Sequence, residues 1–300
     1  MVSEALATAI AAAPERREAI DMRAVDFGAL YQLSVKPEEL HTLRISLWSR
    51  CFDEVLSAVG QPFFAELYGK MLEPEAGQGF SITLVLNLDH IPPDQAAREA
   101  LVQKLSSMKR DVVGAPLWLS FRALLADAKP PKPHYTVHYA ESQCMYVVPQ
   151  PDVVVIVFAL CFSNATEAAI AKIFLQEAEM SRRQSKELAA APSIVYTQEP
   201  PLELRQLGTS RPEPSAIDGF IGHVTIAVSK RVVEAGGVEK VVGLVQGYPC
   251  YLLYHVKATK SQLHTRIRAR STNWLQVLNR AMPEKLDKER KTISGRVFKR

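Results

Sequence analysis

Residues 238–281 read VEKVVGLVQGYPCYLLYHVKATKSQLHTRIRARSTNWLQVLNRA, an apolar pattern with helical spacing that continues for some 44 residues. At ~1.5 Å per residue the helix would be roughly 65 Å long, longer than a domain of this size can cover. At ~100° per residue, one stripe about 100° wide collects the apolar positions. Its members are Leu252, Val256, Thr259, Leu263, Ile267, Trp274, Val277, Leu278 and Ala281. We therefore predict that part of this stripe contacts another chain.

Basic side chains form a second stripe beside the apolar one. They are Lys257, Lys260, His264 and Arg268. Residues 257–300 contain thirteen Lys or Arg and three acidic residues, a net charge of +10, so residues 1–256 carry −6 to give the total of +4. The positive charge is therefore local. Arg270 falls inside the apolar stripe, where an unpaired charge is costly, and we predict that it meets a carboxylate or carbonyl groups there.

A proline-rich segment divides the rest of the chain. Residues 128–133 read AKPPKP, which offers few backbone hydrogen-bond donors and favours an extended conformation. A chain of 300 residues with 47% apolar residues is long enough for two ordinary cores. We predict an N-terminal α+β domain over residues 1–130 and a C-terminal α+β domain over residues 134–300. The second includes the long helix, about 238–282, and the basic tail.

The two halves share an order of predicted elements: strand, strand, helix, strand, long helix. Strands are predicted at residues 25–34, 41–48, 80–88, 135–140, 145–148, 153–162, 193–197 and 221–229, and the other helices at residues 51–72, 94–126 and 166–188. Gly60 and Pro62 indicate a bend in the first of these helices, and Gly114 and Pro116 a break in the second. Short connections favour antiparallel pairing. The predicted fold class is α+β, with two similar domains that each have an antiparallel sheet and flanking helices.

Catalytic signatures are absent from the sequence. There is no GxGxxG, Walker A, HExxH or GxSxG motif, and the four cysteines lack zinc-ligand spacing. His134 and His138 have no Asp or Cys nearby at ligand spacing and are interpreted as surface histidines on a strand. Glu199 and Glu203 flank two prolines, and this rigid acidic corner suits a protein contact or a backbone cap better than acid–base chemistry. We predict no catalytic, cofactor or metal site.

The sequence also gives no indication of a membrane protein. The longest apolar runs, residues 153–162 and 248–254, are shorter than the 18 or so residues that a membrane span needs. Residues 1–13 are rich in alanine, but Glu4 lies where a signal peptide would be basic, so we predict a short helix there. Cysteines without a disulfide framework fit the reducing cytoplasm.

Blocks of residues in the second half resemble a known family. They are Met145-Tyr-Val147, Ile173-Phe-Leu-Gln-Glu177, Glu199-Pro-Pro-Leu-Glu-Leu204, Tyr254-His-Val-Lys257, Leu263-His-Thr-Arg-Ile-Arg-Ala269, Val277-Leu-Asn-Arg-Ala281 and Lys291-Thr-Ile-Ser-Gly295. Their order and spacing are similar to those of subunit 2 of the actin-related protein 2/3 complex, the seven-subunit machine that nucleates actin. Weaker likeness extends over residues 68–74 and 84–92.

The resemblance implies two α/β domains of like fold and a long C-terminal helix packed against its counterpart in subunit 4. It implies a non-catalytic scaffold subunit without a cofactor, which holds the two actin-related proteins and binds the side of the mother filament in the cytoplasmic actin cytoskeleton. The filament-binding residues are then expected to be Lys257, Lys260, His264, Arg266, Arg268, Arg280, Lys285 and Lys291. The residues at the interface with the other subunit are expected to be Leu252, Val256, Leu263, Ile267, Arg270, Trp274 and Leu278.

One residue departs from the family pattern, and one alternative function remains. Pro249 lies where family members continue a helix, so we expect the long helix to be kinked or to begin in two pieces. The alternative is a nucleic-acid-binding protein that uses the +10 tail. Against it, the basic stripe has little exposed aromatic interleaving and the sequence contains no recognised reader motif.

Overall fold

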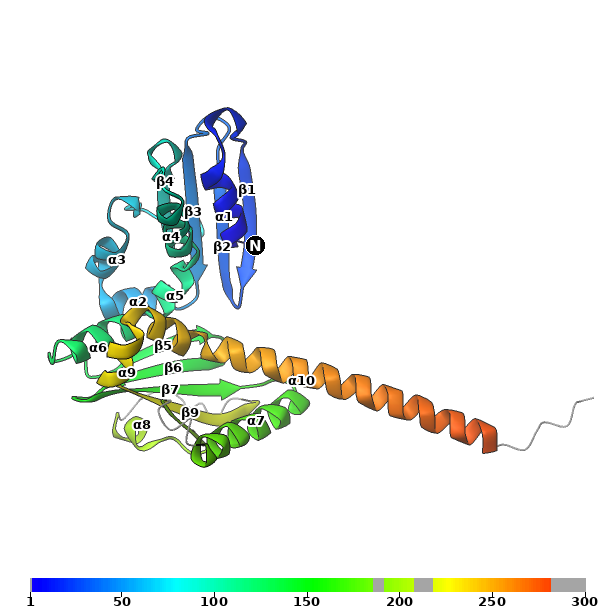
Figure 1. Ribbon diagram of the computed structural model, residues 1–300. Helices are drawn as coiled ribbons and strands as arrows, with labels where there is room; N and C mark the ends of the chain where they lie inside the picture. The colour runs from blue at the N-terminus through cyan, green and yellow to red at the C-terminus, as the bar shows by residue number, and fades with distance from the viewer. Residues whose placement is uncertain (1, 186–191, 208–217, 282–300) are drawn as a thin grey trace, which may run out of the picture.

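The chain forms two antiparallel sheets with helices around them, and one helix extends far beyond both (Figure 1). The structure is a computed structural model that describes residues 2–185, 192–207 and 218–281. The first sheet has four strands in sequential order, and the second has five. The predicted fold class is therefore confirmed.

The first sheet buries one face. Its strands are β1 (Ile20–Asp26), β2 (Ala29–Val35), β3 (Thr42–Ser49) and β4 (Ile82–Asn87). Leu33, Ile45 and Leu84 lie directly opposite one another on adjacent strands, and none has exposed surface. Because side chains alternate along a strand, this row and its neighbours form a continuous apolar face. The helices of this half are α1 (Val2–Ala11), η1 (Pro14–Arg16), α2 (Phe52–Val59), α3 (Gln61–Tyr68), η2 (Gly69–Met71), η3 (Leu88–His90), α4 (Gln95–Ser106), α5 (Met108–Val113) and α6 (Ala115–Leu125).

The second sheet buries side chains on both faces. Its strands are β5 (Tyr135–Ala140), β6 (Gln143–Pro149), β7 (Val153–Cys161), β8 (Ser193–Thr197) and β9 (Phe220–Ser229), in the order β5-β6-β7-β9-β8. On one face Val147, Ile156 and Ile226 line up across three strands in the main core. On the other, Val155 and Val157 pack with Leu204. The remaining helices are α7 (Ala165–Gln184), α8 (Leu202–Gln206), α9 (Lys230–Gly236) and α10 (Val238–Ala281).

One hydrophobic core runs through both halves. Helix α6 precedes the proline-rich segment but packs against β6 and β7 of the second sheet and against α9 and α10. Leu117 and Phe121 on this helix have no exposed surface. The packing therefore crosses the boundary predicted at residues 128–133, since the first half supplies a helix to the core of the second.

Several predicted elements are confirmed and others are corrected. A break at Gly60 separates α2 from α3, and a break at Gly114 separates α5 from α6. The prediction of one strand over residues 25–34 is wrong, because Phe27 and Gly28 have positive φ angles of 41° and 84° and turn the chain into a hairpin. Of the two alternatives predicted at Pro249, a kink or a start in two pieces, the second is wrong, because α10 continues through Pro249. The last residues of the helix predicted at 166–188 lie outside the described part of the chain.

Candidate functional site: the exposed part of the C-terminal helix

The first half of α10 is part of the protein core. Its buried side chains are Val241, Val242, Val245, Leu252 and Val256. Helix α10 approaches the α5–α6 junction so closely that a Cβ atom at Gly114 would lie 2.6 Å from Cγ1 of Val242. The ring of Tyr248 packs on Phe158 of β7, with 5.8 Å between ring centroids. This half of the helix is therefore fixed against both α5–α6 and the second sheet.

An ionic cluster, buried at Asp111 and exposed at Glu239, holds the start of α10. Arg110 on α5 bridges Glu239 on α10 and the neighbouring Asp111, each at 2.8 Å. Tyr68 on α3 donates a hydrogen bond to Asp111 (3.0 Å). Burial raises the pKa of Asp111, although the charge and hydrogen bonds of Arg110 act in the opposite direction. The cluster joins α3, α5 and α10 at one point.

Helix α7 supports α10 up to residue 260. The rings of Phe174 and His255 stack with centroids 5.8 Å apart. Lys260 makes a 2.8 Å ion pair with Glu167 in the first turn of α7. The side chain of Asn164 accepts hydrogen bonds from the backbone N–H groups of residues 166 and 167. Asn164 is therefore the N-cap of α7, and it places the first turn of α7 beside Lys260. The support for α10 thus ends where α7 begins.

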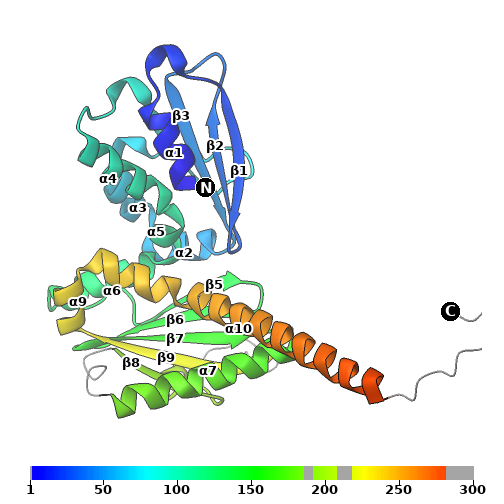
Figure 2. The same cartoon turned by 45° about the vertical axis from the view of Figure 1, so that its right-hand side comes forward.

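Beyond Lys260 the helix is exposed on all sides. Every residue from Ser261 to Ala281, 21 in all, is exposed, and Figures 1 and 2 show this segment leaving the body of the protein. At ~1.5 Å per residue it is roughly 32 Å long. Most of the stability of helices in proteins comes from packing of an apolar face, and the described part of the chain provides no such packing for this segment.

The apolar stripe predicted from the sequence crosses the point where support ends. Leu252 and Val256 lie in the chain's own core, so they offer no surface to another chain. The exposed members of the stripe include Leu263, Ile267, Trp274, Val277 and Leu278, and these five side chains are called the distal stripe. The candidate interface is therefore restricted to residues 263–281. Arg270 lies within this segment, and no hydrogen bond or ion pair joins it to another described residue.

The predicted filament-binding residues divide into three groups. Lys257, His264, Arg266, Arg268 and Arg280 are exposed. Lys260 is held by Glu167 within the chain. Lys285 and Lys291 lie outside the described residues. At ~100° per residue, Arg266 and Arg280 fall on the opposite side of the helix from Lys257 and Arg268, so the structure does not bring all these cations onto one face.

Two of the residues considered for catalysis, Glu199 and His138, are engaged in local contacts. Glu199 pairs with Arg205 at 2.7 Å. Glu54 accepts a hydrogen bond from the backbone N–H of His138 (2.8 Å) and lies 2.9 Å from the ring Nδ1 of that residue. Among the described residues, no group of three or more His, Cys, Asp or Glu could hold a metal ion.

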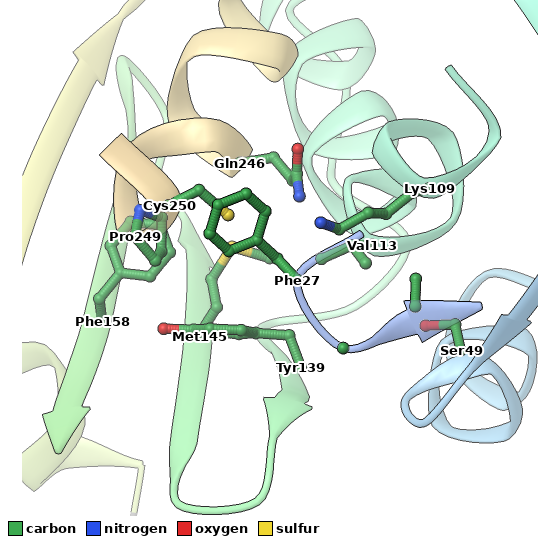
Figure 3. A pocket seen from close by; sticks show the side chains of 12 residues that line it. Phe27, Ser49, Lys109, Val113, Tyr139, Met145, Phe158, Gln246, Pro249 and Cys250 are labelled. Carbon is green, nitrogen blue, oxygen red and sulfur yellow. The ribbon is translucent and has the colours of Figure 1, made fainter. Parts of the chain in front are cut away.

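A small cavity lies where the β1–β2 hairpin meets β7 and α10 (Figure 3). Its volume is about 30 Å³, and Met145, Phe158 and Pro249 are among the side chains around it. Lys109 and Gln246 are its longest polar side chains, and no Asp, Glu or His lines it. A cavity of this size holds about one water molecule, so it is too small for a substrate.

No helix in the described part of the chain is long and apolar enough to cross a membrane.

A body of two sheets from which one basic, partly apolar helix extends fits a structural subunit of a larger assembly. A family model described as "Arp2/3 complex, 34 kD subunit p34-Arc" matches residues 45–285. Since this match covers more than half of the sequence, the chain belongs to that family of non-catalytic Arp2/3 complex subunits, which act in actin nucleation.

Two relatives agree with the family match. The chain is 31% identical to "Actin-related protein 2/3 complex subunit 2" of Schizosaccharomyces pombe, in an alignment that covers 95% of this chain and 93% of the relative. It is 32% identical to the protein of the same name in Dictyostelium discoideum, with 87% and 85% covered. The resemblance found in the sequence blocks is therefore confirmed.

Proposed function

We propose that this subunit pairs with subunit 4 of the complex through the distal stripe and binds the side of the mother actin filament through the basic face of α10. It would thereby form the core of the complex and hold the two actin-related proteins at a branch in the cytoplasmic actin cytoskeleton. The observation that carries the proposal is the helix from Ser261 to Ala281, which is exposed on all sides although it contains large apolar side chains.

The distal stripe offers enough apolar surface for a stable contact. Its five large side chains would each contribute ~1.5–3 kcal/mol if they became fully buried. The total is on the order of 10 kcal/mol before the entropic cost of association is subtracted. A partner helix that runs along the stripe fits its width and its spacing.

Neighbouring leucines provide a matched test of the pairing. Leu278 belongs to the distal stripe, whereas Leu275 lies about 60° away from it, and both side chains are exposed. The full chain would be co-expressed with the other subunits, and recovery of subunit 4 with the tagged chain would be measured. We expect L278D to reduce this recovery at least ten-fold and L275D to reduce it less than two-fold. Equal recovery with both variants would contradict the assignment of the stripe.

The basic face of α10 can orient the subunit on the filament, but no single cation can supply most of the binding free energy. Lys257, His264 and Arg268 are exposed on one side of α10, whereas Lys260 is paired with Glu167. Exposed ion pairs contribute roughly 0–1 kcal/mol each, so several must act together. The helix carries no acidic residue from Lys240 to Ala281, which favours an acidic binding surface.

Charge reversal tests the filament contact. In actin cosedimentation of the assembled complex at low salt, we expect the K257E/R268E double variant to bind filaments roughly ten-fold more weakly. A control double variant, R23E/K36E, makes the same change in charge at two exposed positions, one on β1 and one just after β2. Similar loss with both doubles would show that net charge alone matters, and no loss with K257E/R268E would refute the filament-binding proposal.

A further inference from the structure

Helix α10 has a second apolar face in the segment that is anchored to the body. Leu244, Tyr251 and Tyr254 point away from the core, with exposed fractions of 67%, 56% and 64%. Together with Gly247 and Ala258 they repeat at intervals of three and four residues. This is the spacing with which one helix packs against another. These five residues are called the outer ridge.

The outer ridge is rigid. The buried side chains of Val245, Leu252 and Val256 fix the opposite face of the same helical turns. The ring of His255 lies 4.2 Å from that of Tyr251 and 5.2 Å from that of Tyr254, measured between centroids. His255 in turn stacks on Phe174 of α7. Two tyrosines that are exposed but held in place are typical of the residues that dominate protein interfaces.

From Lys240 onwards, every charged side chain of α10 around the outer ridge is positive, and the one acidic residue of the helix, Glu239, is paired with Arg110. Between Lys240 and Ala281 the sequence has no Asp or Glu. Lys240 lies one turn before Leu244 and Lys257 lies next to Tyr254 on the helix surface, and both are exposed. A partner that covers the ridge must place its own charges beside these lysines, so an acidic partner is favoured over a neutral or basic one.

We propose that the outer ridge docks an amphipathic α-helix of another polypeptide in the assembled complex, with its apolar side chains between Tyr251 and Tyr254 and its acidic side chains beside Lys240 and Lys257. The helical spacing of the outer ridge favours a helix over an extended segment as the partner. The positive charges of Lys240 and Lys257 favour a partner with acidic side chains on either side of its apolar face. The ridge and the distal stripe lie on roughly opposite sides of α10. The proposal therefore does not rest on pairing with subunit 4 through the distal stripe.

Photocrosslinking in the assembled complex tests the proposal. The photoreactive residue p-benzoylphenylalanine would replace Tyr251 or Tyr254 in the full chain, and crosslinked peptides would be sequenced by mass spectrometry. We expect one peptide with a net negative charge and apolar residues at intervals of three and four. The same probe at Ile173, an exposed residue on α7 and not on α10, should not capture that peptide. Crosslinks only to added actin filaments, to a basic or extended segment, or to nothing would overturn the proposal.

A second measurement separates loss of docking from loss of folding. With the photoreactive residue at Leu244, the Y251A/Y254A double variant should lower the yield of the same crosslink roughly ten-fold or more, because buried aromatic anchors carry most of the affinity of an interface. The I173A variant should leave the yield unchanged. Since the truncated side chains are exposed in the free chain, circular dichroism should show unaltered folding. A yield reduced less than two-fold in the double variant would refute docking at the ridge.

Discussion

At the scale of single residues, the position of α10 depends on Gly114. A glycine is needed there because a larger side chain would not fit, and not because the backbone has an unusual angle. Gly114 has φ of −87°, which any residue adopts. A Cβ atom there would lie 2.6 Å from the carbonyl oxygen of Arg110 and 2.6 Å from Cγ1 of Val242. Real Cβ atoms do not approach other atoms so closely, so a larger residue must displace α10 or the α5–α6 junction.

Alanine substitutions at two glycines should therefore have opposite effects. We expect G114A to lower the free energy of unfolding by ~1–3 kcal/mol through overpacking. Gly247 lies inside α10 with nothing within 4 Å of a Cβ atom, so G247A should raise the free energy by up to ~1 kcal/mol through helix propensity. Urea denaturation of both variants measures the difference, and a stable G114A protein would show that the junction can relax.

The hydrogen bond between Tyr68 and Asp111 should matter most when the carboxyl group is charged. Burial raises the pKa of Asp111 above its ordinary value, so stability falls as pH rises from the ordinary carboxyl range through the raised pKa, and the loss is complete above it. The Y68F variant removes a hydrogen bond that lowers this pKa. The pKa should therefore rise further, and the variant should lose ~1.5–3 kcal/mol at neutral pH and less in acid.

Urea denaturation at about pH 8 and about pH 4.5 measures this pH dependence. A suitable control is Y248F, since the Tyr248 hydroxyl makes no hydrogen bond to another described residue. A loss in Y68F that is equal at the two pH values would show that Asp111 does not change its charge in this range.

At the scale of elements, the sequence predicts α10 well but not which part of it is free. Its long helical periodicity locates the start at Val238, and the helix is described to Ala281. The same stripe contains Leu252, which is buried, and Ile267, which is exposed. The pattern is alike at both positions because burial depends on α7, which ends its support at the Glu167–Lys260 pair. The outer ridge was not predicted, although its spacing can be seen in the sequence. The stronger apolar stripe on the same helix accounts for the helical periodicity by itself, so the periodicity does not indicate a second apolar face.

Hydrogen exchange should reveal the change of support along α10. In the isolated chain, backbone amides before residue 256 should exchange slowly, because they lie on a packed helix. Amides from 261 to 281 should exchange at least a hundred-fold faster, since only marginal helix stability protects them. In the assembled complex the two segments should be protected alike. Slow exchange at 261–281 in the isolated chain would mean that this helix is stable without a partner.

At the scale of the whole molecule, the proline-rich segment is a break in secondary structure but not in packing. The sequence indicates the boundary because prolines at 130, 131 and 133 cannot donate hydrogen bonds. The sequence cannot show that α6, which lies before the prolines, packs its apolar residues against the second sheet. An amphipathic pattern indicates which face of a helix is buried, but not which surface that face packs against. The hairpin at Phe27 escapes prediction for a related reason: alternation continues on both sides of the turn.

Fragments that differ only by α6 should decide whether the second half folds without it. Leu117, Trp118, Phe121 and Leu124 are buried on α6, and at ~1.5–3 kcal/mol each they contribute ~6–12 kcal/mol. This sum is comparable with the ~5–15 kcal/mol that stabilises a typical domain. A fragment of residues 134–300 should therefore show no cooperative thermal transition, whereas a fragment of residues 115–300 should show one. Both fragments keep the same exposed helix, so aggregation through the distal stripe affects them equally. A cooperative transition in the shorter fragment would mean that the predicted boundary at the proline-rich segment, and not the continuous core, describes how the chain is divided.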